Sequence, residues 1–80
     1  MNNHYGIDVE THDSLKLIRR LKRLKTTISI KDGGRYYQDP SYCQVHLITT
    51  WNEEQLDNWL YLYSNCDYVG VFKMDSTDNE

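Results

Sequence analysis

Three histidines and the carboxylates near them are the residues whose types could bind a metal ion. His4 and His12 flank Asp8 and Glu10 near the N-terminus, and imidazole together with carboxylate is a common ligand set for zinc. The spacing matches no compact ligand motif, and an expected strand separates the two histidines. We therefore predict no metal site and no cofactor.

The two cysteines are the candidate nucleophiles. Cys43 and Cys66 lie far apart with no Cys-x-x-Cys pair, which favours reduced, partly buried thiols in a cytosolic protein. Nothing marks either thiol as activated, and the sequence contains neither a glycine-rich phosphate loop nor a nucleophile-elbow motif. Because a two-layer domain of 80 residues rarely encloses a catalytic pocket, we predict that the protein is not an enzyme.

The strongest charge feature is the basic segment SLKLIRRLKRLK, residues 14–25, in a chain of formal net charge -3. Residues 16–35 hold eight cations and one anion, whereas residues 39–80 hold one cation and eight anions. Leu17, Leu21 and Leu24 recur at helical spacing, so the cations fall on the opposite face of the predicted helix. The candidate partner-binding cations on this face are Lys16, Arg19, Arg20, Lys22 and Arg23.

This basic face admits three interpretations. A charged, solvated face is the ordinary state of an amphipathic helix. A second helix that begins with Glu53, Glu54 and Asp57 could also lie beside the first and neutralise part of its charge. The third interpretation is a partner surface, for an acidic protein patch or for nucleic acid. We favour protein because nucleic-acid-binding domains usually carry net positive charge, and this chain does not.

The elements that position these residues follow from the spacing of apolar side chains. Alternation predicts strands over residues 4–10, 27–31, 42–51 and 68–74. Helices are predicted over residues 14–25 and 52–65, the second capped by Asn52 with Gln55 three residues later. Asp32–Gly–Gly34 predicts a hairpin turn. Residues 75–80, DSTDNE, are predicted to form an acidic disordered tail.

The order strand, helix, strand, strand, helix, strand predicts a ferredoxin-like βαββαβ fold of the α+β class. Both helices would cover one face of a four-stranded antiparallel sheet, with the strands in the order 4-1-3-2. Residues 1–74 are predicted to form this single domain, because the chain has no room for a second core. No apolar run approaches the ~20 residues that span a bilayer, and we expect no membrane contact.

The sheet face without helices is the second candidate surface. If Val45, Leu47, Val69 and Val71 point to the core, the opposite face shows the candidate partner-binding residues His46, Ile48, Tyr68 and Phe72. RNA-binding domains of the RRM family stack bases on aromatic residues of such a face, but residues 42–51 lack that family's signature. We therefore expect either a protein contact here, a homodimer included, or partial cover by residues 33–42.

The stretch NEEQLDNWLYLY, residues 52–63, resembles a helix of some small phage-encoded inhibitors, including anti-CRISPR proteins. The chain is also similar to them in being short, acidic, rich in Tyr and Trp and free of catalytic motifs. The resemblance implies a protein that occupies a surface of a larger host or defence complex, and it assigns no functional residues.

We therefore predict a small non-catalytic protein-binding module, most concretely a phage-type inhibitor. One alternative is a nucleic-acid-binding domain that uses residues 14–25, and another is a small regulatory domain that dimerises through its sheet. The N-terminus has no cationic start and no apolar run, so we expect no signal peptide. The expected location is the cytoplasm, which would be that of the host cell if a phage encodes the chain.

Overall fold

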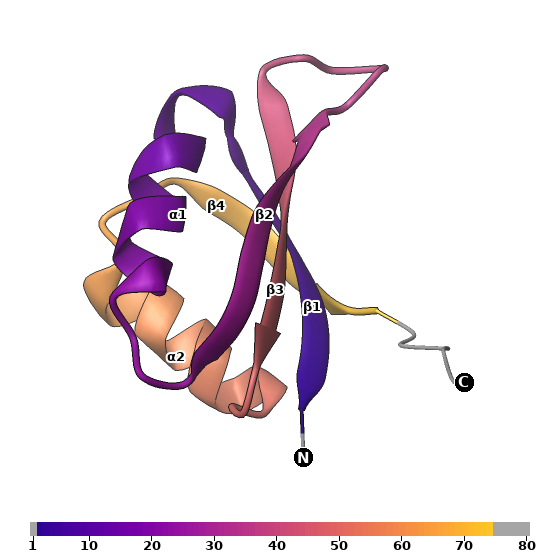
Figure 1. Cartoon of the computed structure of the whole chain (residues 1–80). Coiled ribbons are helices and arrows are strands. Elements are labelled where there is room, and N and C mark those ends of the chain that lie inside the picture. The colour runs from indigo at the N-terminus through magenta and orange to yellow at the C-terminus, as the bar shows by residue number, and fades with distance from the viewer. Residues whose placement is uncertain (1, 75–80) are drawn as a thin grey trace.

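A computed structural model describes residues 2–74 of the chain, and Figure 1 shows a layer of two helices against one face of a sheet. The elements are β1 (Asn3–Glu10), α1 (Ser14–Lys22), β2 (Thr27–Arg35), β3 (Tyr42–Thr49), α2 (Glu53–Tyr63) and β4 (Tyr68–Lys73), with a 3-10 turn at Thr11–Asp13 before α1. The predicted α+β class and element order are confirmed. The predicted tail, residues 75–80, lies outside the described residues.

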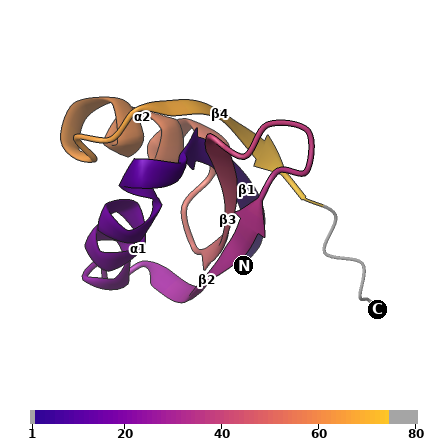
Figure 2. The same cartoon turned by 90° about the horizontal axis from the view of Figure 1, so that it is seen from above.

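The sheet has four strands in the order β2-β3-β1-β4, which is the predicted order read from the opposite edge. The first strand lies between the third and the fourth, because β1 pairs antiparallel with both. Ile7 is the centre of this arrangement, opposite Val45 on one side and Val71 on the other. Figure 2 shows the helices on one side of this sheet and the β2–β3 connection leaning to the other.

The core lies between the sheet and the helices. Alternate residues of β1 and β3 point to it, as period-2 alternation requires, and one stripe of each helix meets them. The buried apolar residues of this cluster are Tyr5, Ile7, Val9, Leu17, Ile18, Leu21, Val45, Leu47, Leu56 and Leu60. Burial of each such Leu or Ile side chain stabilises the fold by about 1.5–3 kcal/mol.

The predicted faces of the last strand are wrong at its start. The β1–β4 register shifts between Asp8 and Val9, so that Gly70 opposes Asp8 and Tyr68 opposes Val9. Val69 is the extra residue of this β-bulge, and its side chain is 63% exposed instead of buried. Tyr68 packs against the core instead of standing on the open face, and its hydroxyl donates to Asp57 of α2.

Two further boundaries differ from the predictions. Helix α1 ends at Lys22 instead of residue 25, and the β-branched Thr26 and Thr27 follow shortly after. Asp32, Gly33 and Gly34 belong to strand β2 instead of forming a turn. The connection to β3 lies at residues 36–41, where Asp39 accepts a hydrogen bond from the Ser41 amide at 3.2 Å.

Neither helix within residues 2–74 combines the length and the apolar character that crossing a membrane requires.

Candidate functional site

The cations of α1 gather on its solvent side. Arg19, Arg20, Lys22 and Arg23 are exposed. Lys16 is half-buried, and its Nζ lies 3.6 Å from a carboxylate oxygen of Asp13. The other ion pairs within residues 2–74 join His12 to Glu10 and to Asp13. None of these pairs joins α1 to α2, so the expected neutralisation by Glu53, Glu54 and Asp57 is not found in this part of the chain.

The open face of the sheet carries three of its four predicted residues. His46 and Ile48 alternate on β3 with the buried Val45 and Leu47, and Phe72 stands half-exposed on β4. Tyr68 is the fourth, and the bulge at Val69 turns it to the core side. The predicted surface therefore contains one aromatic residue of the last strand instead of two.

A polar network closes the middle of this open face. The Tyr36 hydroxyl, from the β2–β3 connection, donates a hydrogen bond to the Asp8 carboxylate. The Gln44 side-chain amide donates to the Tyr36 oxygen at 2.9 Å. Burial, followed by the bond to Asp8, raises the pKa of Tyr36 to about 12. Tyr36 is therefore protonated at neutral pH and donates to Asp8. Through these bonds the β2–β3 connection covers part of the open face, which agrees with the predicted partial cover by residues 33–42.

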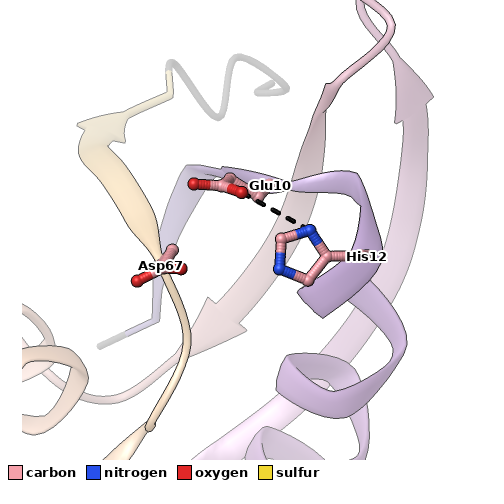
Figure 3. A group of neighbouring side chains, drawn as sticks. All are labelled: Glu10, His12 and Asp67. Atoms are coloured by element: carbon pink, nitrogen blue, oxygen red, sulfur yellow. Dashed lines mark ion pairs between the residues drawn. The ribbon is translucent and has the colours of Figure 1, made fainter.

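A mixed cluster of Glu10, His12 and Asp67 forms where β1 meets the segment before β4 (Figure 3). One ligand-type atom from each residue lies within 4.8 Å of the other two. The amide of Glu10 donates to the Asp67 carbonyl at 3.0 Å, which holds the two segments together. His12 Nδ1 lies 3.4 Å from a Glu10 carboxylate oxygen. The cluster is open to solvent, and we interpret it as a surface ion pair.

Among the elements of residues 2–74, helix α2 has the most exposed large apolar side chains, namely Tyr61, Leu62 and Tyr63. Leu62 is 63% and Tyr63 is 64% exposed. They lie beside a pair of tryptophans, Trp51 and Trp59, whose ring centroids are 6.3 Å apart. We call these four residues the α2 patch. Together with Gln55 and Asn58 they line a shallow hollow of about 320 Å³.

Hydrogen bonds between side chains and the backbone fix the start of α2. The Asn52 side chain accepts from the Gln55 amide at 2.8 Å, and the Gln55 side chain accepts from the Asn52 amide at 2.9 Å. This confirms the predicted capping box. The Trp51 carbonyl accepts from the Tyr5 hydroxyl at 3.1 Å. These bonds fix the segment that carries Trp51 against the sheet.

The sequence predicts one apolar stripe on this helix, formed by Leu56, Trp59, Leu60 and Tyr63, and this prediction missed the α2 patch. Leu56 and Leu60 are buried in the core and Trp59 packs against it, but Tyr63 is exposed. With Leu62, the apolar residues of α2 therefore extend beyond the face that meets the core. A count of large apolar residues beyond the core stripe would have indicated a second contact surface.

Comparisons with protein-family models, with curated proteins and with solved structures found no match to this chain.

Proposed function

We propose that this protein is a non-catalytic protein-binding module and that the α2 patch is its contact surface. The observation that carries the proposal is the exposure of Leu62 and Tyr63 beside the Trp51–Trp59 pair around one hollow. Protein interfaces are enriched in Trp and Tyr, and such residues dominate the energy of binding when they fill a pocket. Exposed groups of large apolar residues mark interaction sites on small soluble domains.

The chemistry of the α2 patch suits a partner that presents an apolar side chain bordered by cations. The hollow accepts an aliphatic or aromatic group between Trp59 and Leu62. Glu53 and Glu54 occupy the first turn of the same helix and are exposed, so they would face Lys or Arg residues of that partner. Complementary charge of this kind fixes orientation and speeds association.

A phage-type inhibitor, which occupies a surface of a larger host or defence complex, is the most concrete form of this proposal. Such a role needs a small rigid scaffold that displays a hydrophobic contact. The scaffold we propose is the ferredoxin-like plan. Its support is the position of β1 between β3 and β4 and the placement of both helices on one face.

The basic face of α1 is the second candidate surface. Its support is the exposure of Arg19, Arg20 and Lys22 on α1 and of Arg23 directly after it. An acidic protein patch would pair with these cations. Nucleic acid is the less favoured partner, because the chain as a whole carries formal charge -3 and would repel a phosphate backbone from most directions.

Affinity capture from a cell lysate, with and without nuclease, tests the proposal. The wild type is compared with Leu62→Lys, with Tyr63→Lys and with Tyr37→Lys as a matched control. Tyr37 is 100% exposed in the β2–β3 connection, outside the α2 patch. We expect a nuclease-resistant protein partner that both patch variants lose and the control keeps. Equal capture by all four proteins would refute the assignment of the patch.

The same experiment separates the α1 surface from the α2 patch. A variant with Arg19→Glu, Arg20→Glu and Arg23→Glu should keep its circular dichroism spectrum, because exposed charges shift stability by about 0.5 kcal/mol or less. If this variant alone loses the partner, the basic face is the contact. If nuclease removes everything that is captured, a nucleic-acid-binding function replaces the proposed protein-binding function.

A further inference from the structure

Two histidines that are distant in the sequence face each other on the open side of the sheet. His4 Nε2 lies 3.4 Å from His46 Nδ1. Their ring centroids are 5.6 Å apart and the rings are tilted by 53°. His4 belongs to β1 and His46 to β3, and the two strands pair directly. The sheet therefore places the two imidazole nitrogens at hydrogen-bonding distance, and which nitrogen donates depends on the tautomers of the rings.

A glycine of β2 lies against the His46 ring, and Gly6 is the residue opposite His46 on β1. On the β2 side, a Cβ at Gly33 would lie 2.5 Å from His46 Nε2. The Nε2 side of the His46 ring therefore lies over Gly33, while Nδ1 faces His4.

The separation of the two nitrogens matches the bite of a metal ion. Two nitrogens that bind one tetrahedral zinc ion at about 2.0–2.1 Å lie about 3.3–3.4 Å apart. We propose that His4 and His46 form a binding site for a late first-row divalent cation, with Zn²⁺ as the defining ligand. Imidazole is a donor that Zn²⁺, Cu²⁺ and Ni²⁺ share. The two protein donors leave two positions of a tetrahedral ion to water or to a third ligand.

One cation lies beside the pair. Lys31 lies opposite His46 on β2, and its charge opposes a bound cation.

This site departs from the expectation of no metal site, which rested on the spacing of the histidines along the sequence. His4 and His46 are brought together by the antiparallel register of β1 and β3, which local spacing does not reveal. The inference is independent of the α2 patch, which lies on the helical layer and not on the open face of the sheet (Figure 1).

Isothermal titration of the untagged wild-type protein with Zn²⁺ near neutral pH tests the proposal. We expect saturable binding of one ion per chain. His46→Ala and His4→Ala should each weaken binding at least about tenfold, because loss of even an outer partner of a metal ligand costs 10–100-fold. Lys31→Gln should tighten binding, because it removes the opposing charge.

His12→Ala is the matched control, because His12 is an exposed histidine that lies beside Glu10 and Asp67 instead. It should leave the affinity unchanged. Imidazole NMR signals of His4 and His46 should shift together on addition of Zn²⁺, which reports the site even if a variant is less stable. Loss of binding in His12→Ala with retention in His46→Ala, or no binding by the wild type, would overturn the proposal.

Discussion

The backbone of Gly33 lies against the imidazole of His46: a Cβ at Gly33 would lie 2.4 Å from His46 Cδ2 and 2.8 Å from the Gln44 carbonyl oxygen. Real Cβ atoms do not approach other atoms so closely, and one of the two obstacles is backbone. Glycine is thus required here by the close approach of β2 to β3. This contact lies within β2, at the residues for which the sequence predicts a hairpin turn.

Gly33→Ala should therefore destabilise the fold by about 1–3 kcal/mol, as overpacking does elsewhere. The measurement is a thermal or urea denaturation curve. Gly70→Ala is the matched control, because its nearest contact would be an ordinary 3.5 Å to the Phe72 ring. The control should lie within about 1 kcal/mol of the wild type. An equal loss of stability in both variants would show that the Gly33 contact is not the cause.

Asp13 should make stability depend on acid pH. Its carboxylate accepts a hydrogen bond from the Asp67 amide at 2.9 Å, and this bond lowers the pKa of Asp13 below its ordinary value of 3.8. Asp13 therefore binds a proton more readily in the unfolded chain than in the folded one. The ionised Asp13 stabilises the fold fully above about pH 3.8, and this stabilisation is lost as the pH falls through the lower pKa of the folded state. Asp13→Asn should flatten the acid limb of a plot of unfolding free energy against pH. An acid limb that is unchanged in Asp13→Asn would refute this role.

Tyr36 should titrate late among the tyrosines. Its pKa is raised to about 12 by burial and by its bond to Asp8. The protonated Tyr36 therefore stabilises the fold fully below pH 10, and this stabilisation is lost as the pH rises through about 12. Burial also raises the pKa of Tyr5 and of Tyr68, so Tyr36→Phe should reduce the amplitude of the late phase in the ultraviolet absorbance of the phenolates. Asp8→Asn should shift the Tyr36 part of that phase to lower pH.

Tyr37→Phe is the control for this titration, because Tyr37 is fully exposed. It should leave the late phase in place. A late phase of undiminished amplitude in Tyr36→Phe would assign the high pKa to another tyrosine.

The helices and strands of this fold could be predicted because alternation and capping pairs depend on residues that are close in the sequence. Alternation along β3 places Val45 and Leu47 on the core side, and the Asn52–Gln55 pair marks the start of α2. The misassigned positions depend on contacts between distant segments. A one-residue bulge at Val69 reverses the faces at the start of β4, and single-sequence alternation does not reveal a bulge.

The candidate surfaces were harder to predict than the fold. Exposed cations such as Arg19 and Arg20 follow from helical spacing, and they lie where the sequence predicts. The α2 patch does not follow from helical spacing. Periodicity places Leu60 and Tyr63 close together on the helix, but it does not reveal that Leu60 is buried against the sheet while Tyr63 is exposed. The way that a helix rotates against its sheet is decided by tertiary packing.

The central claim is that a protein partner covers the α2 patch, and the patch holds both tryptophans of the chain. Fluorine NMR of protein that is labelled with fluorotryptophan tests this claim most directly, because the captured partner contributes no signal. Trp51→Phe and Trp59→Phe assign the two resonances. On addition of the captured partner, we predict that both resonances shift and become less sensitive to solvent. Unchanged tryptophan resonances in a complex that forms at the same concentrations would contradict the account.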